Sequence, residues 1–90
     1  MSREAAPERI AVAWAVEART DLRGIDQNTA LQILYCVDRY LLSRLGDVKQ
    51  LKAPRTGFRL RCGDHRVFFL QSGENSICIM GVRNRRDAYC

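Results

Sequence analysis

The sequence predicts an α+β fold in which a helical hairpin packs on a small antiparallel sheet. Apolar residues recur at helical spacing over residues 26–45, which predicts one long amphipathic helix. Three extended runs, at residues 58–62, 65–71 and 76–83, are separated by turn-forming residues and predict a meander. A short apolar run at residues 10–16 comes before them. The predicted order is therefore strand, helix, helix and three antiparallel strands.

The length of 90 residues suits one compact domain and excludes two. A hydrophobic content of 47% and a charged content of 28% are typical of a globular protein and exclude a disordered one. Residues 1–8 are expected to form a flexible tail, which leaves residues 9–90 as a single domain. The longest apolar run has seven residues, whereas a membrane helix needs about 20. We therefore expect a soluble, cytoplasmic protein that does not enter a membrane.

The first half of the chain supplies the N-terminal strand and both helices. Residues 10–16 are apolar on both faces and predict a short strand buried on both sides, with a helix as the alternative. Ala18 and Leu22 share one helical face and predict a short helix over residues 17–24. Asp26 is placed to cap the long helix, which is expected to run to about Leu45 and end at glycine.

The second half of the chain supplies the sheet. Residues 47–57 are expected to connect the long helix to the sheet as a loop. Gly63 and Asp64 predict a tight hairpin turn that sets Cys62 opposite His65 and Arg61 opposite Arg66. Side-chain alternation then sorts the hairpin into two faces. The face expected to cover the helices carries Phe58, Leu60, Cys62, His65, Val67 and Phe69. The opposite face carries Arg59, Arg61, Arg66, Phe68 and Leu70.

The excess of positive charge is confined to the second half of the chain, which includes this hairpin. The formal net charge is +5. Residues 47–90 hold nine basic and four acidic side chains, whereas residues 1–46 hold six of each. Two arginines opposite each other destabilise a sheet by up to about 1 kcal/mol unless an anion lies between them. Guanidiniums beside the ring of Phe68 suit phosphates and stacked bases, which favours a single-stranded nucleic acid. A solvated basic surface is the alternative.

The cysteines and the single histidine offer no metal site. The four cysteines include no C-x-x-C pair, so no zinc site forms at ordinary spacings. We expect Cys36, Cys62 and Cys78 to be buried, reduced thiols, and Cys90 to be an exposed one. His65 falls on the helix-covered face, which favours a structural role over general-base catalysis.

Three segments of the sequence resemble the RelE/ParE superfamily of bacterial toxins, in particular the RelE-like messenger-RNA endonucleases of type II toxin–antitoxin systems. These segments are residues 46–52 (GDVKQLK), 58–68 (FRLRCGDHRVF) and 82–89 (VRNRRDAY). The likeness extends from about Trp14 to Tyr89. The fold of that superfamily, a helical hairpin on a small antiparallel sheet, agrees with the fold predicted from the residues.

The resemblance implies cleavage of mRNA on the ribosome, without metal or other cofactor, by attack of a ribose 2′-hydroxyl on the adjacent phosphate. By position, Arg66 matches the arginine of the family that binds the phosphate, Arg85 the arginine at the leaving group, and Tyr89 the terminal tyrosine against the nucleotide. The further RNA-binding residues would be Lys52, Arg59, Arg61, Phe68 and Arg86.

Proton transfer has two candidate groups in this sequence. Arg59 and Arg61 stand where some members of the family carry lysines. Because a guanidinium does not readily give up its proton, these two side chains can stabilise charge but transfer protons poorly. The general base is then Tyr89 or, failing that, His65.

The resemblance also implies partners and an alternative function. The expected partner is a cognate antitoxin that covers the basic face in a hetero-oligomeric complex, with a groove near Tyr35, Tyr40 and Leu42 as a further contact. The alternative is a ParE-like toxin that inhibits DNA gyrase without cleaving RNA, and a third possibility is a plain RNA-binding module. The segment that follows Val82 is either a basic tail or a cover that brings Arg85 or Arg86, together with the Tyr89 phenol, to a bound phosphate.

Overall fold

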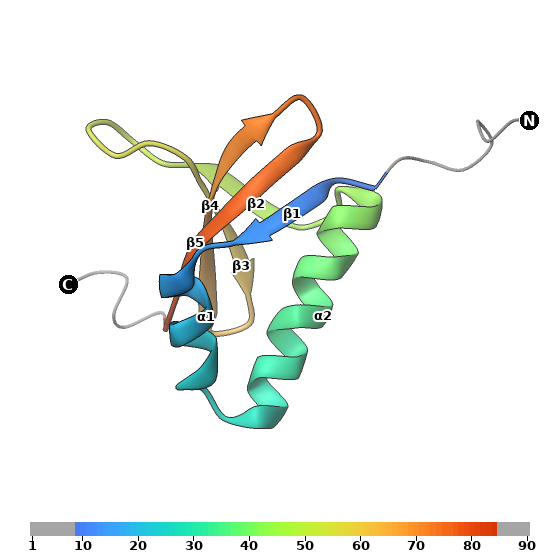
Figure 1. Cartoon of the computed structure of the whole chain (residues 1–90), viewed down its shortest axis with the longest axis vertical. Coiled ribbons are helices and arrows are strands. Elements are labelled where there is room, and N and C mark those ends of the chain that lie inside the picture. Colours follow the sequence, from blue (N-terminus) through green and yellow to red (C-terminus); the bar gives the residue numbers. More distant parts are fainter. Residues whose placement is uncertain (1–8, 85–90) are drawn as a thin grey trace, which may run out of the picture.

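The computed structural model describes residues 9–84, which form a five-stranded sheet with two helices (Figure 1). The strands are β1 (Ala11–Trp14), β2 (Asp47–Gln50), β3 (Phe58–Cys62), β4 (His65–Gly73) and β5 (Ser76–Asn84). The helices are α1 (Val16–Arg23) and α2 (Gln27–Ser43). This is the predicted α+β fold, with one strand more than the sequence indicated.

The strands are arranged in the order β1-β5-β4-β3-β2. β1 runs parallel to β5, and every other neighbouring pair is antiparallel. In Figure 1, α2 lies along one face of the sheet and α1 lies beside the C-terminal half of β5. The other face of the sheet is not covered by α2.

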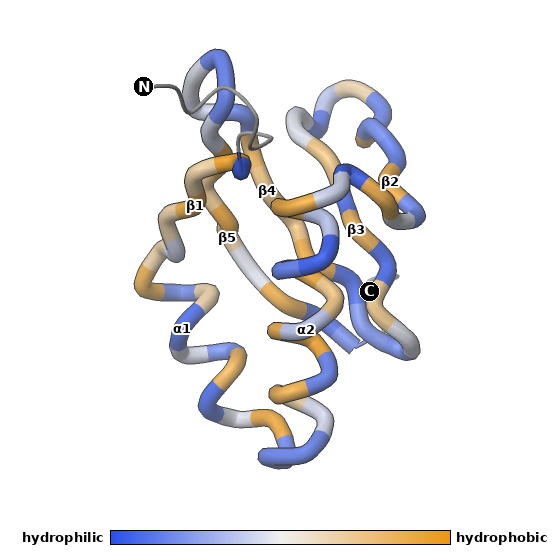
Figure 2. The backbone as a smooth tube through the Cα atoms, turned by 90° about the vertical axis from the view of Figure 1, so that its right-hand side faces the viewer, coloured by the Kyte–Doolittle hydropathy of each residue, from blue (hydrophilic) through white to orange (hydrophobic). Residues whose placement is uncertain are grey.

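The core forms between α2 and the covered face of the sheet. Ile33, Val37 and Leu41 recur every four residues along α2 and are buried. They pack against buried residues of the central strands, among them Leu60, Val67, Phe69, Ile79 and Val82. Figure 2 shows hydrophobic and hydrophilic residues alternating along β3, as expected for a strand with one covered face.

The long helix begins as predicted and ends slightly earlier. The Asp26 carboxylate accepts the backbone N–H of Thr29 at 3.2 Å, which is the predicted N-cap. The helix ends at Ser43 because Arg44 adopts a left-handed conformation with φ of 61°. Gly46 is needed for another reason: a Cβ there would lie 2.8 Å from the Leu60 side chain. It permits close approach of the chain to β3 and does not end the helix.

The main difference between prediction and structure is β2. Residues 47–50 were expected to form part of a loop, but they pair with β3 as an antiparallel edge strand. The strand is short and largely exposed, so its sequence lacks the apolar alternation that identifies a half-buried strand. β1 is a strand, as predicted, but it is not buried on both sides, since Ala11 and Ala13 are exposed.

The hairpin between β3 and β4 has the predicted register. Cys62 pairs with His65 and Arg61 with Arg66, across a turn in which Gly63 has a φ of 64°. The pairing between β4 and β5 is less regular, with a shift between Phe68 and Phe69 that leaves Met80 as an extra residue. Relative to the pairing of Phe69 with Ile79, this bulge places Arg83 of β5 beside Arg66 of β4.

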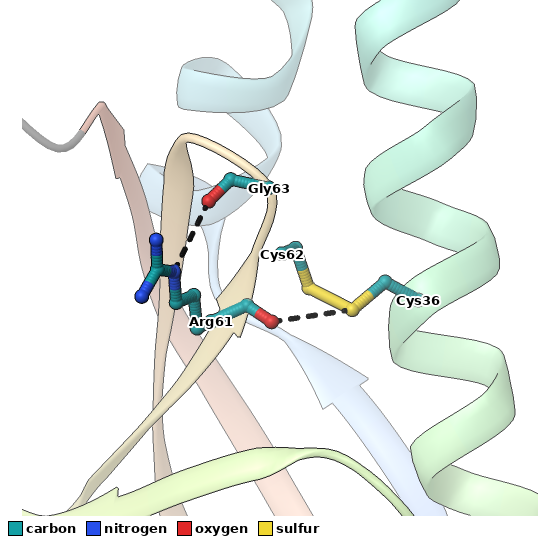
Figure 3. The surroundings of a disulfide bond; sticks show 4 residues. All are labelled: Cys36, Arg61, Cys62 and Gly63. Carbon is teal, nitrogen blue, oxygen red and sulfur yellow. Dashed lines mark hydrogen bonds between the residues drawn. A yellow bond between two sulfur atoms is a disulfide. The ribbon is translucent and has the colours of Figure 1, made fainter.

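The prediction that Cys36 and Cys62 are reduced thiols is wrong, because the two residues form a disulfide bond (Figure 3). Their Cα atoms lie 5.9 Å apart, where α2 crosses the end of β3. A separation of 26 residues along the chain does not reveal this contact. Cys78 is a free, half-buried thiol, and Cys90 lies outside the described residues. Among the helices of residues 9–84, none is long and apolar enough to cross a membrane.

Candidate functional site

A row of three arginines crosses the open face of the sheet. Arg61 on β3 is paired with Arg66 on β4, and Arg66 is paired with Arg83 on β5. Their sequence neighbours Val67 and Val82 are buried in the core. Because side chains alternate along a strand, the three arginines lie on the face opposite the core. We call Arg61, Arg66 and Arg83 the basic row.

A second line of residues extends the same face. Lys49 on β2 is paired with Arg59 on β3, and Arg59 is paired with Phe68 on β4. Both Arg59 and Phe68 are half-buried, so they present part of their surface to solvent. We refer to the basic row together with Lys49 and Arg59 as the basic face. Asp47, opposite Arg61, supplies a negative charge at the edge of the sheet.

Arg66 occupies the centre of the basic row and is the most enclosed residue in it. Among the described residues it is the one buried charged side chain, with 7% of its surface exposed, and its Nε and Nη1 atoms have no contact with solvent. The sheet therefore holds the Arg66 guanidinium in a restricted position between two further arginines.

Arg61 is exposed, and its position is fixed by the turn and by the disulfide. Its Nε donates to the carbonyl oxygen of Gly63 at 3.5 Å, which leaves both terminal amino groups outside that bond (Figure 3). On the other side of the strand, the Cys36 sulfur lies 3.6 Å from the Arg61 carbonyl oxygen. The Cys36–Cys62 bond thus braces the backbone of Arg61 from the side of α2.

The basic row brings like charges close together, and a bound anion would lower their mutual repulsion. It contains two adjacent pairs of like charges, Arg61 with Arg66 and Arg66 with Arg83. Each such pair destabilises a sheet by up to about 1 kcal/mol. A phosphate can accept hydrogen bonds from several guanidiniums at once and neutralise part of their charge. The arrangement is therefore suited to binding a phosphate group at the level of Arg66.

The structure brings together four of the residues predicted from the sequence. Arg59, Arg61, Arg66 and Phe68 share the open face in the predicted pairing. Lys52 does not join them, because it follows β2 in an exposed loop. The three remaining site residues, Arg85, Arg86 and Tyr89, lie outside the described residues. His65 is half-buried at the start of β4, and alternation along the strand places it on the helix side, as predicted.

Sequence reasoning missed Arg83 and Lys49 as members of the site. If the pairing of Phe69 with Ile79 continued without the bulge at Met80, Val82 would lie opposite Arg66 in place of Arg83. The signal for Lys49 is its alternation with Val48, which becomes informative only when residues 47–50 are assigned to a strand. Within residues 9–84, no group of three or more His, Cys, Asp or Glu side chains is placed to hold a metal ion.

The fold and the basic row define a small α+β protein in which one face of the sheet carries a cluster of arginines. Residues 12–89 match the family described as the ParE toxin of the type II toxin–antitoxin system parDE. The match spans most of the chain, so the protein belongs to this family and is a toxin of a type II toxin–antitoxin system. The resemblance to the RelE/ParE superfamily is confirmed.

Solved structures of toxins share the fold. The toxin–antitoxin complex RelBE2 of Mycobacterium tuberculosis matches 86% of this chain over 99% of its own, with a TM-score of 0.70 and 24% identity. The archaeal RelE–RelB complex of Pyrococcus horikoshii matches 86% of this chain over 96% of its own (TM-score 0.69, 19% identity). The match to the YoeB dimer of Staphylococcus aureus covers 83% of this chain and 95% of the YoeB chain (TM-score 0.64, 19% identity). No curated protein sequence matches the chain. At these identities the structures show that the fold is shared.

Proposed function

We propose that this toxin is an endoribonuclease that cleaves mRNA on the ribosome and thereby stops translation. The observation that carries the proposal is the basic row, in which Arg66 is buried between Arg61 and Arg83 on adjacent strands. A fixed cluster of guanidiniums favours a phosphate whose negative charge increases during the reaction. The shared fold with RelE and YoeB toxins adds support.

The proposed reaction is an internal transfer within the RNA. The 2′-oxygen of a ribose forms a bond to the adjacent phosphorus, and the bond from phosphorus to the 5′-oxygen of the next nucleotide breaks. The products are a 2′,3′-cyclic phosphate and a 5′-hydroxyl. The pentacoordinate intermediate carries additional negative charge on its non-bridging oxygens. Arg66 would stabilise that charge and remain protonated throughout.

Proton transfer would come from the C-terminal segment. The 2′-hydroxyl loses a proton and the 5′-oxygen gains one, so the reaction needs a base and an acid. Tyr89 is the proposed base, because arginines brought close to it at the bound phosphate would favour its phenolate. Arg85 would lie at the leaving oxygen and offset its charge. His65 is a weaker candidate for the base, since it lies on the helix side of the sheet.

The remaining site residues would hold the RNA. Arg59, Arg61, Lys52 and Arg86 would contact phosphates, and the Phe68 ring would stack with a base. Because the guanidiniums supply the positive charge, the proposed chemistry requires no metal ion or other cofactor.

The proposed partners are mRNA and the ribosome during toxicity and a cognate antitoxin during inhibition, all in the cytoplasm. Two of the structural relatives are toxin–antitoxin complexes, which supports a protein partner for this toxin. An acidic segment of the antitoxin would neutralise the basic face and block access to Arg66. The inhibited form would then be a hetero-oligomer.

Gyrase inhibition is the second candidate function, and the ParE family match favours it. In that case the basic face would bind gyrase or its DNA and would perform no chemistry. Retention of Arg66, Arg85 and Tyr89 in one chain favours the nuclease, because binding alone does not require this combination.

The two functions are separated by induced expression followed by mapping of mRNA 5′ ends, with a gyrase supercoiling assay in parallel. New 5′ ends within translated codons are expected with the wild-type toxin and absent with Arg66→Ala. Arg19→Ala serves as a control that removes the same charge from an exposed position on α1. Intact mRNA together with inhibited supercoiling would overturn the nuclease proposal.

A further inference from the structure

The outer edge of β5 has two different neighbours along its length. Its first half pairs with β1, from Ser76 to Ile79, and the N–H of Ala15 donates to the Ile79 carbonyl at 2.9 Å. The chain then turns away into α1, while β5 continues to Asn84. Beyond Ile79, no described strand pairs with this edge of β5.

Where no strand pairs with this edge of β5, a carboxylate bonds to it instead. Oδ2 of Asp21, on α1, accepts the backbone N–H of Val82 at 3.0 Å in a part-buried position. In a continuing strand, this N–H would donate to a backbone carbonyl of the neighbour. The bond joins residues that are 61 positions apart, so it fixes α1 to β5 directly beside the basic row.

The same oxygen lies close to two other residues of β5. Asp21 Oδ2 is 4.0 Å from Nε of Arg83. A Cβ on Gly81 would lie 3.3 Å from that oxygen, which is tighter than ordinary contact. Gly81 directly follows the extra residue of the bulge, Met80. The carboxylate therefore contacts β5 at the point where the bulge sets the pairing of its last residues.

We propose that Asp21 is a positioning residue for the nuclease site. By accepting the Val82 N–H, it holds the bulged part of β5 in the register that sets Arg83 beside Arg66. Its charge orients the Arg83 guanidinium, whose side chain is 59% exposed and can reach a ligand from this position. Asp21 itself contacts no RNA and acts through Arg83. The inference rests on the proposed ribonuclease function, and what it adds is the role of Asp21 in placing Arg83.

The test is the rate of mRNA cleavage in a reconstituted translation reaction. We expect Asp21→Ala to lower the rate by about tenfold, and Arg83→Ala by a similar factor. The double variant, Asp21→Ala with Arg83→Ala, should cleave no more slowly than Arg83→Ala alone, because Asp21 acts through the Arg83 side chain. Asp21→Asn keeps an oxygen acceptor for the Val82 N–H without the charge, so it should recover part of the rate. Glu17→Ala is the matched control, since it removes an exposed carboxylate from the same helix.

Thermal unfolding is measured for each variant so that cleavage is compared only between folded proteins. If Asp21→Ala does not fold, Gly81→Ala replaces it, because its Cβ would displace the Asp21 carboxylate without removing it. Either variant cleaving at the wild-type rate would overturn the inference. The inference would also be overturned if Asp21→Ala slowed cleavage in the Arg83→Ala protein by the same factor as in the wild type. That result is expected of a residue that only stabilises the fold. Wild-type toxin that leaves mRNA intact would instead refute the ribonuclease proposal itself.

Discussion

Reduction of the Cys36–Cys62 disulfide is predicted to destabilise the toxin strongly. The bond joins α2 to the end of β3 and closes a loop between residues 26 positions apart. On a chain-entropy treatment, a cross-link of this span stabilises the fold by about 3.5 kcal/mol, because it restricts the unfolded chain. For a domain of this size, each kcal/mol corresponds to about 4–8 °C in Tm. Reduction should therefore lower Tm by roughly 14–28 °C.

The assay is thermal unfolding followed by circular dichroism, with and without dithiothreitol. Cys36→Ser combined with Cys62→Ser should match the reduced wild type and should no longer respond to the reductant. Cys78→Ser is the control, since Cys78 is a free thiol and its loss leaves the cross-link intact. An equal Tm for oxidised and reduced wild type would refute the reasoning, as it would show that the loop closed by this bond adds nothing to stability.

Three further predictions concern the site and the helix that supports it. Arg66→Ala should lower the rate of mRNA cleavage by at least about 100-fold, which is the loss typical when a group that stabilises an oxyanion is removed. Arg66→Lys should recover only a small part of that rate. Near-normal cleavage by Arg66→Ala would refute the role assigned to Arg66. Wild-type binding to single-stranded RNA should weaken as salt rises, and Arg61→Ala should reduce the slope of log K against log salt by about 0.7, as for one lost phosphate contact; an unchanged slope would place Arg61 away from the backbone of the RNA. Asp26→Ala should lower the free energy of unfolding by about 1 kcal/mol, because it removes the acceptor of the Thr29 N–H. This is measured by chemical denaturation, and an unchanged midpoint would contradict the prediction.

Short-range patterns in the sequence were enough to predict the long helix and the β3–β4 hairpin. The N-cap at Asp26 and the turn at Gly63 are local features, and alternation from that turn fixes the pairing of Arg61 with Arg66. The centre of the candidate site follows from this register alone. For that reason four of the predicted site residues were found together on one face.

The features that were missed depend on contacts between distant parts of the chain. β2 is recognised as a strand only through its pairing with β3. The disulfide depends on where α2 crosses the sheet. Arg83 joins the basic row through a bulge at Met80, next to which Asp21 of α1 bonds to the strand. None of these leaves a periodic pattern in the sequence.

The most direct test of the ribonuclease proposal is a chemical analysis of RNA ends. Purified toxin is added to ribosomes carrying a defined mRNA, and the upstream fragment is examined for its 3′ terminus. We predict a 2′,3′-cyclic phosphate at that terminus with wild-type toxin and intact mRNA with Arg66→Ala. A 3′-hydroxyl terminus would contradict the proposed attack by the 2′-hydroxyl, and uncut mRNA with the wild-type toxin would contradict the assignment of ribonuclease activity.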